Sequence, residues 1–187
     1  MKSRDQRDGI EHYEWAMTSE AELTFSTEVR PEWTDYNGHM NGAFHPLVFD
    51  RATDVLLDTV DLGEAYSKRS KCGTFALEAH IIYKREALLC DPLKVTVQVI
   101  GFNEKTIHYF HRMFRSDTGE LLATFEQISL HVSHETRSAV PMPARAIERL
   151  DNLLRAHSKY GVPEGLGSVI AVRRTGPTKV TLARQTE

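Results

Sequence analysis

One amphipathic helical pattern interrupts a chain whose other periodic segments are mostly strand-like. It follows residues 33–41 and continues to about Leu62. Its apolar positions are Phe44, Val48, Ala52, Val55, Leu56 and Val60, and the acidic positions opposite them are Asp50, Asp54 and Asp58. This division is typical of a helix with one face on a core and the other in solvent or at an interface. Pro46 fits only the first helical turn, so we expect the helix to begin near residues 43–45, with Asn41 as N-cap and Gly63 as C-cap.

Strand patterns with period two lie on both sides of this helix. Residues 23–33 alternate before it, and Pro31 ends regular pairing because it has no N–H. The later strand segments are residues 75–83, 93–99, 106–115 and 120–131. In the last of them the apolar face changes phase, and a β-bulge near Glu126 or Gln127 would account for the change.

A second, shorter amphipathic pattern covers residues 144–157. The order is thus strand, long helix, four antiparallel strands and small helix. A sheet of about five strands that wraps around the long helix buries its apolar face, which is the α+β hotdog fold. We expect an N-terminal arm at 1–21, the folded domain at 22–160, and an extended or partly disordered tail at 161–187.

Composition excludes several classes of protein. A chain of 187 residues suits one domain, and a net charge of -3 argues against a nucleic-acid binder. There is no apolar run of roughly 20 residues for a membrane helix, and the first residues lack the apolar segment of a secretory signal. Cys72 and Cys90 form no C-x-x-C motif, so we expect reduced thiols in a cytoplasmic protein. The nine histidines show no metal-ligand spacing, so no metal is expected.

The turn before the long helix carries the chemistry. Asp35 stands three residues before Gly38, and Asn37-Gly38 is a strong turn dipeptide. Helix N-termini present unpaired N–H groups and a partial positive charge, which suit a developing oxyanion. A carboxylate beside such donors predicts a hydrolytic site, although Asp is also an ordinary turn residue.

The motif Asp35-x-x-Gly38-His39-x-Asn41, with Phe49-x-x-Ala52 behind it, resembles the 4-hydroxybenzoyl-CoA thioesterase family of hotdog proteins. The resemblance covers residues 23–143. Within the family, the string from residue 33 to residue 41 is most similar to thioesterases of carnitine and betaine catabolism. This implies hydrolysis of a small acyl-CoA, with betainyl-CoA as one candidate, to free acid and CoA. It also implies no cofactor beyond the CoA of the substrate, and a homodimer or dimer of dimers.

The resemblance also assigns roles to the turn residues. Asp35 matches the catalytic aspartate, which acts as nucleophile or as general base. The N–H groups around Gly38, His39 and Met40 match the donors that polarise the thioester carbonyl, and Asn41 completes the motif. Another branch of hotdog thioesterases uses a glutamate within the central helix, and this chain has no glutamate between Asn41 and Asp61.

Other residues are weaker candidates for substrate binding. Trp33 and Tyr36 could form an aromatic wall for a trimethylammonium group, or could simply pack. Glu78 and His80 share one strand face and could line the cleft or form a surface ion pair. Arg137 could meet CoA phosphates or be an ordinary surface charge.

Two other functions suit the same fold. A hydratase or dehydratase of acyl thioesters would use a histidine with an acid, for which His39 and Asp35 are a poor match. A non-catalytic module would bind acyl-CoA without turnover.

Overall fold

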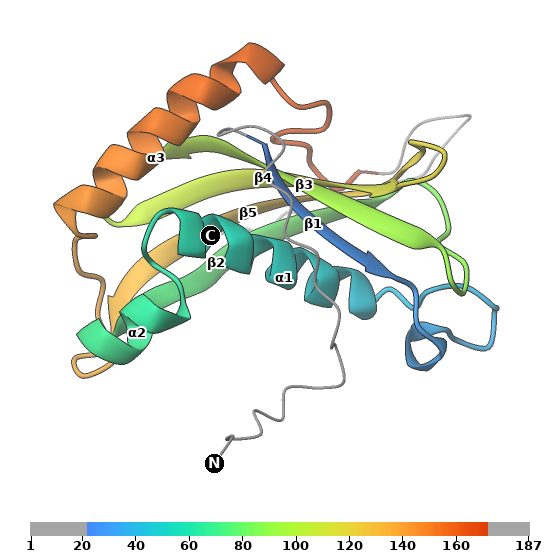
Figure 1. The fold of residues 1–187 in the computed structure, drawn as a ribbon, viewed down its shortest axis with the longest axis horizontal. Helices are drawn as coiled ribbons and strands as arrows, with labels where there is room; N and C mark the ends of the chain where they lie inside the picture. Colours follow the sequence, from blue (N-terminus) through green and yellow to red (C-terminus); the bar gives the residue numbers. More distant parts are fainter. Residues whose placement is uncertain (1–21, 172–187) are drawn as a thin grey trace, which may run out of the picture.

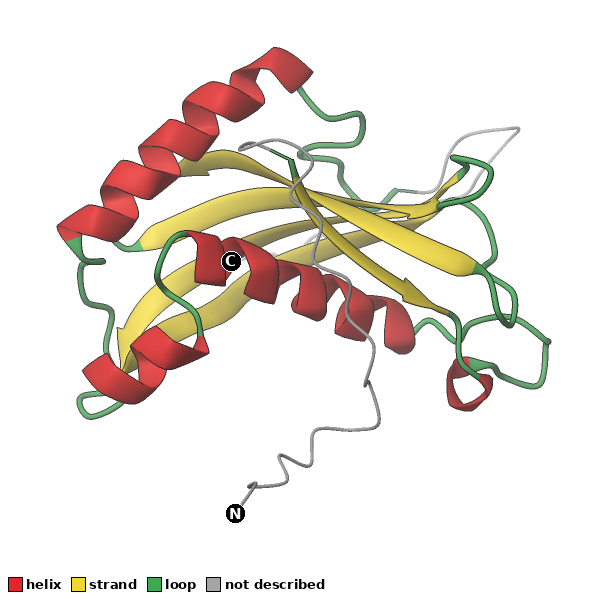
Figure 2. Cartoon of the chain, viewed as in Figure 1, coloured by secondary structure: helices red, strands yellow, loops and turns green. Residues whose placement is uncertain are grey.

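A computed structural model describes residues 22–171 as a single antiparallel sheet with helices packed against it (Figures 1 and 2). The strands are β1 (Leu23–Glu28), β2 (Cys72–Tyr83), β3 (Pro92–Phe102), β4 (Thr106–Arg115) and β5 (Leu121–Ser133). Their order across the sheet is β1-β3-β4-β5-β2. This arrangement confirms the predicted hotdog architecture. The predicted arm and the tail beyond residue 171 lie outside the described residues.

The long helix α1 (Phe44–Thr59) lies across one face of the sheet, called here the inner face (Figure 1). Phe49 stacks on Phe125 of β5 at 5.0 Å between ring centroids, and both side chains are buried. Val48, Ala52 and Leu56 are fully or almost fully buried as well. The apolar stripe read from the sequence is therefore the surface that joins helix to sheet.

The predicted end of this helix is wrong by one turn. The helix stops at Thr59, and Asp61 takes a left-handed conformation with φ of 62°. Gly63 does not cap α1 but begins a short helix that the sequence did not reveal, α2 (Glu64–Ser70). A Cβ at Gly63 would collide with the Asp58 carboxylate, so close approach rather than capping explains this glycine.

The C-terminal helix α3 (Ala144–His157) packs beside β3 where β1 no longer pairs with it. The pairing of β1 with β3 ends at Val97, and the N–H of Val99 donates to Nδ1 of His157 at 2.9 Å. Arg149 also donates to the carbonyl of Thr59, which ties α3 to the end of α1. Two short 3-10 turns, Pro31–Trp33 and Ser158–Tyr160, complete the elements.

The bulge predicted near Glu126 or Gln127 is wrong. The register shifts lie between Ala76 and Glu78 on β2, between Val99 and Gly101 on β3, and opposite Met113 and Phe114 of β4, where Leu122 is the extra residue on β5. Gln127 keeps regular pairing with Tyr109 and stays on the inner face. The apolar pattern changes there because polar side chains occupy inner-face positions, not because a residue is inserted.

Strand β2 is the outer strand next to β5, and much of it is exposed. Leu77 is 58% exposed, Tyr83 51% and Phe75 37%. Within residues 22–171, no strand pairs with its other edge. No helix among these residues has both the length and the apolar character needed to cross a membrane.

Candidate active site

The residues before α1 form a small hairpin that holds Asp35. The N–H of Asp35 donates to the carbonyl of His39 at 3.0 Å, and the N–H of Asn41 donates to the carbonyl of Trp33 at 2.8 Å. At the tip, Gly38 has φ of 81°, a conformation that side chains with Cβ rarely adopt. The Asn37-Gly38 dipeptide therefore forms the predicted turn.

The carboxylate of Asp35 is fixed from within this hairpin. Its Oδ1 accepts the backbone N–H of Asn37 at 2.8 Å, and its Oδ2 accepts the side-chain amide of Asn37 at 3.4 Å. Nδ1 of His39 lies 3.8 Å from Oδ1 of Asp35 and 3.4 Å from the carbonyl oxygen of Met40. The Asp35 side chain is only 14% exposed. The acid is thus oriented and partly sheltered rather than turned into solvent.

Two of the amides predicted as oxyanion donors are occupied. The N–H of Gly38 donates to the carbonyl of Asp35, and the N–H of Met40 donates to the carbonyl of Ala87 at 2.7 Å. Within the described part of the chain, the N–H groups of His39 and Gly42 have no acceptor. The available donors at this end of α1 are therefore His39, which the sequence predicted, and Gly42, which it did not.

Asn41 organises the first turn of α1 without being its N-cap. Its side-chain oxygen accepts the N–H of Ala43 at 2.9 Å, and its carbonyl accepts the N–H of Phe44 at 3.0 Å. The helix itself is preceded by Ala43, which makes no side-chain cap. Asn41 thus takes up two amides and leaves that of Gly42 open.

Tyr83, from the end of β2, closes over this turn. Its hydroxyl donates to the carbonyl of Gly42 at 3.1 Å, and a Cβ at Gly42 would lie 3.3 Å from the same hydroxyl oxygen. Its ring meets His45 edge-on at 5.0 Å. The alternating pattern of β2 puts Tyr83 on the inner face, but nothing in the sequence relates it to a glycine 41 residues earlier.

His45 is a buried imidazole beside this site. It is 3% exposed, and neither ring nitrogen has a partner at hydrogen-bonding geometry among the described residues. Burial lowers the pKa of His45, the nearby Asn41 backbone partly offsets this, and the charge of His39 lowers it further. His45 is therefore neutral at physiological pH.

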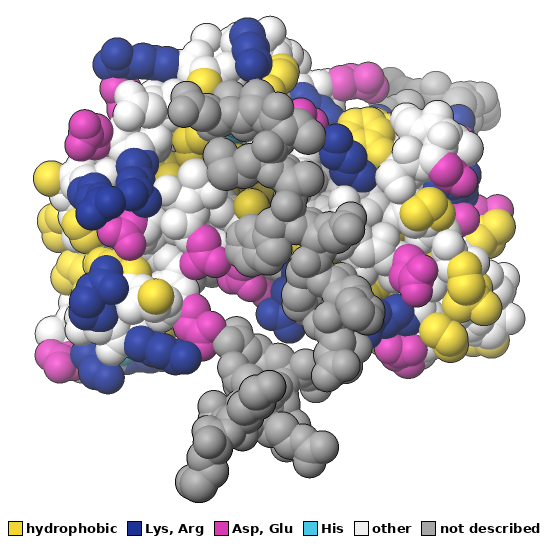
Figure 3. Space-filling model, viewed as in Figure 1, with side chains coloured by type: hydrophobic (Ala, Val, Ile, Leu, Met, Phe, Trp, Pro, Cys, Tyr) yellow, Lys and Arg dark blue, Asp and Glu magenta, His cyan; other side chains and the backbone are white. Residues whose placement is uncertain are grey.

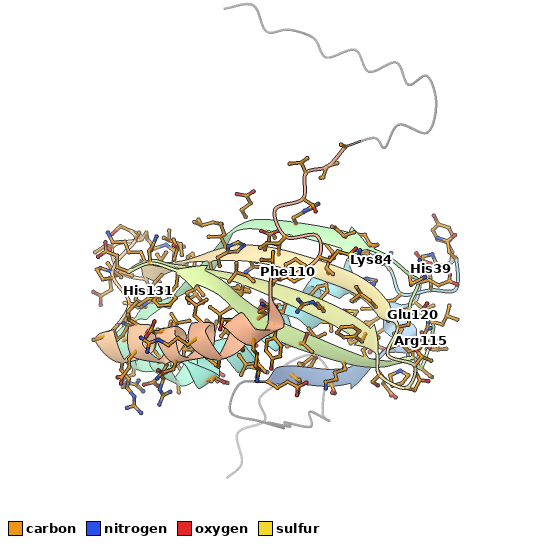
Figure 4. The ribbon with its side chains drawn as sticks, turned by 90° about the horizontal axis from the view of Figure 1, so that it is seen from above. His39, Lys84, Phe110, Arg115, Glu120 and His131 are labelled. Atoms are coloured by element: carbon orange, nitrogen blue, oxygen red, sulfur yellow. The ribbon has the colours of Figure 1, made fainter. Side chains whose placement is uncertain are left out.

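An ion-pair network holds the chain segment that is hydrogen-bonded to the Asp35 hairpin. Arg115 contacts Asp91 at 2.9 Å and Glu120 at 2.6 Å, and it donates to the carbonyl of Glu86. Asp91 in turn accepts the N–H of Leu88. Figure 4 shows Arg115 and Glu120 at the same end of the molecule as His39. The network fixes the segment whose Ala87 carbonyl binds Met40.

The two predicted aromatic residues do not lie together. Trp33 is 4% exposed, stacks on Phe44 at 6.0 Å, and has the Arg30 guanidinium over its ring at 5.5 Å. Tyr36 is 97% exposed at the tip of the hairpin. This geometry supports the packing alternative for Trp33 and gives no joint aromatic wall.

The other predicted substrate-binding residues lie away from Asp35 within the chain. Glu78 and His80 are on the face opposite α1, where His80 is in register with Glu126. The guanidinium of Arg137 lies 5.3 Å from the centre of the Phe75 ring. The backbone N–H of Arg137 donates to the carbonyl of Ser133, at the end of β5. That end of β5 carries His131, at the far end of the sheet from His39 (Figure 4). On the face of the molecule drawn in Figure 3, Lys and Arg side chains gather over α2 and α3.

No group of three or more His, Cys, Asp or Glu residues within 22–171 could hold a metal ion. The site itself offers a fixed carboxylate, Asp35, and the open amides of His39 and Gly42. Such an arrangement can activate water, or attack a carbonyl, next to a place for the resulting oxyanion.

Comparison with known proteins agrees with this geometry. The model of the thioesterase-like superfamily matches residues 29–150. A betainyl-CoA thioesterase of Pseudomonas aeruginosa is 36% identical over 154 residues, which is 82% of this chain and 97% of that protein. An L-carnitine dehydrogenase/betainyl-CoA thioesterase of Rhizobium meliloti is 33% identical over 79% of this chain, but the chain spans only 30% of its length.

Solved structures show the same fold. A putative thioesterase from Pseudomonas putida is 33% identical, with a TM-score of 0.71 over 82% of this chain and 97% of that one. A hypothetical protein from Staphylococcus aureus, solved in complex with CoA, has a TM-score of 0.77 at 24% identity, over 81% of this chain and 96% of that one. The chain belongs to the thioesterase-like superfamily, and it is a thioester hydrolase of the hotdog fold.

Proposed function

We propose that the protein hydrolyses acyl-CoA thioesters with Asp35 as its catalytic carboxylate. The observation that carries this proposal is the Asp35 side chain, 14% exposed and held by Asn37 at 2.8 Å, at the start of a helix with an open amide at Gly42. A thioester carbonyl is electrophilic and a thiolate leaves readily. The protein must then supply a positioned carboxylate and an oxyanion site.

Asp35 serves this reaction in one of two ways. As general base it takes a proton from water while the water oxygen bonds to the carbonyl carbon. As nucleophile its carboxylate forms a mixed anhydride that water then hydrolyses. In both, the carbon–sulfur bond breaks, CoA leaves as thiolate and takes a proton from solvent, and the His39 and Gly42 amides receive the oxyanion.

Betainyl-CoA is the first substrate to test. The names of both relatives described above include betainyl-CoA thioesterase, and the similarity to the first of them covers 97% of that protein. The CoA complex of the Staphylococcus aureus neighbour supports CoA as the thiol part. No separate cofactor is needed, because the reaction transfers an acyl group to water.

In this proposal two copies of the chain form a dimer by pairing along β2. The free edge of this 12-residue strand carries exposed Leu77, Phe75 and Tyr83, and long apolar edges of this kind favour pairing. Two such strands related by a two-fold axis run antiparallel. The Phe75 end of one copy, with Arg137, then lies beside the Tyr83 end of the other. In such a dimer Arg137 approaches the partner's site rather than its own.

Release of free thiol from a panel of acyl-CoA esters tests the proposal. The panel contains betainyl-CoA, aromatic and straight-chain esters, and an enoyl-CoA. Steady thiol release over many turnovers is the expected result. Hydration of the enoyl ester without thiol release would favour a hydratase, and stoichiometric binding without turnover would favour a binding module; either outcome would overturn the proposal.

A further inference from the structure

A hydrogen-bonded polar cluster lies on the inner face of the sheet, where the strand pattern would otherwise place apolar residues. The hydroxyls of Tyr109 and Ser129 are 2.6 Å apart. The side-chain amide of Gln127 donates to Tyr109 at 2.5 Å and to Ser129 at 3.0 Å. Polar groups on a buried face cost stability unless they are satisfied, so their presence at adjacent positions calls for an explanation.

The cluster leaves an amide oxygen open as a hydrogen-bond acceptor, besides the one hydroxyl hydrogen that the bond between Tyr109 and Ser129 does not use. Both amide hydrogens of Gln127 go to the two hydroxyls, and its carbonyl oxygen has no partner among the described residues. Burial raises the pKa of Tyr109 to about 12, and the charge of Asp50 adds to this rise. His111, behind Tyr109, supplies no positive charge, because burial lowers its pKa to about 3.

Asp50 is an exposed residue of α1, next to the flank of the helix that faces β4. Thr53, which is 3.1 Å from His111, marks this flank, and Asp50 lies roughly 60° beyond it around the helix. On the sheet side, Ala76 and Ala79 of β2 stand opposite Ser129 and Gln127. Both alanines are exposed, so this strip of the inner face is open and its side chains are small.

The open strip leads from the catalytic end of α1 to the cluster. Tyr83 lies beside Gly42 at one end, and Ala79 lies beside Gln127 farther along the same strand. Asp50 is seven residues after Ala43, which is about 10 Å along the helix axis. An acyl group whose carbonyl lies at Gly42 would therefore extend toward Asp50 and Gln127.

We infer that Asp50 and the Tyr109–Gln127–Ser129 cluster select a small acyl group that carries a positive charge. The Asp50 carboxylate and the side-chain oxygen of Gln127 attract a cation, and the cluster itself contains no positively charged side chain that would repel it. This inference rests on the proposed thioesterase function, and it assigns the choice of acyl group to residues other than Trp33 and Tyr36.

A pair of isosteric substrates tests the inference. Betainyl-CoA and 3,3-dimethylbutyryl-CoA differ by a quaternary nitrogen in place of a quaternary carbon, so shape is matched and charge is not. The ratio of their kcat/KM values is measured by thiol release. We expect the unmodified protein to prefer betainyl-CoA by at least about tenfold, a difference of about 1.4 kcal/mol.

Variants assign this preference to residues. Asp50→Asn is expected to lower the ratio about tenfold, and Gln127→Met to lower it less. Asp54→Asn is the matched control, because it makes the same change one turn later at an exposed residue 3.7 Å from Arg51. Its ratio is expected to equal that of the unmodified protein.

The outcomes separate the two proposals. Equal use of both esters, or an unchanged ratio in Asp50→Asn, would overturn the inference and leave the thioesterase function in place. A ratio that falls as much in Asp54→Asn as in Asp50→Asn would also overturn it. Failure to release thiol from either ester or from any other member of the panel would overturn both.

Discussion

The backbone N–H of Asn37 donates to Oδ1 of Asp35 at 2.8 Å, across a turn that only Gly38 closes without strain. This bond points one carboxylate oxygen in a fixed direction before any substrate arrives. Preorganisation of this kind lowers the cost of reaching the transition state. The conformation of Gly38 is therefore part of the catalytic geometry.

We predict that Gly38→Ala lowers kcat more than an equally destabilising substitution elsewhere does. Its φ of 81° disfavours alanine, at a cost of about 1–2 kcal/mol, although nothing within 4 Å obstructs a Cβ. Gly119→Ala is the control, because Gly119 has φ of 72° and the same open surroundings. Urea unfolding should show similar destabilisation of both variants, and thiol-release assays should show a fall in kcat only for Gly38→Ala. Equal activity in the two variants would argue against a role for the turn.

We predict that Gly42→Ala impairs hydrolysis through Tyr83. An added Cβ would lie 3.3 Å from the Tyr83 hydroxyl oxygen, so the ring must shift beside the proposed oxyanion amide. A loss of tenfold or more in kcat is expected, in the range found for damaged oxyanion sites. Removing the hydroxyl in Tyr83→Phe should relieve the contact. The double variant should then be more active than the product of the two single effects, and strict additivity would contradict this contact.

We predict that His111 makes folding stability depend on pH below about 6.5. The folded pKa of His111 is about 3, so the unfolded chain binds a proton there that the native protein does not. The contribution of neutral His111 to the free energy of unfolding is therefore fully present above pH 6.5. It is lost as the pH falls toward 3, by up to about 1.4 kcal/mol per pH unit. Denaturant unfolding from pH 7 to pH 4 measures this slope. His111→Phe should reduce it, leaving the smaller contribution of His45; an unchanged slope would assign the dependence to other groups.

We predict that the free edge of β2 carries a dimer contact. Leu77 is 58% exposed at the register shift of this strand, so Leu77→Lys should leave the fold intact while opposing edge pairing. Sedimentation should give a dimer or larger assembly for the unmodified protein and a smaller species for the variant. Val162→Lys, at an 83% exposed apolar residue outside β2, is the control. A monomer in both cases would contradict the pairing.

The sequence predicted the fold because local patterns and topology agree. The stripe on α1 and the alternation of β3 each required one buried face, and a single helix within a meander left one arrangement. The Asp35 turn was readable for the same reason, since Asn37-Gly38 specifies its own geometry. Short elements were not readable: α2 has seven residues, too few for a periodic pattern.

The parts of the site that sequence could not supply depend on contacts between distant residues. Tyr83 meets Gly42 across 41 positions, and neither carries a local sign of the other. The only local sign of the cluster of Tyr109, Gln127 and Ser129 is a break in the apolar alternation of β5, and such a break also predicts a bulge. The motif predicts Met40 as an oxyanion donor, but its N–H bonds to Ala87, far along the chain, whereas the N–H of Gly38 is taken up by Asp35 within the turn itself.

The most direct measurement compares thiol release by Asp35→Asn and by the unmodified protein. Asparagine keeps the size of the side chain and removes its charge, so it can neither take a proton nor attack the carbonyl at a useful rate. Asp117→Asn, in the exposed turn after β4, makes the same change away from the site. We predict a fall in kcat of at least about 100-fold for Asp35→Asn, in the range typical of lost general acid–base groups, and activity within twofold of the unmodified protein for Asp117→Asn. Hydrolysis by a folded Asp35→Asn at the unmodified rate would contradict the assignment of Asp35 as the catalytic carboxylate.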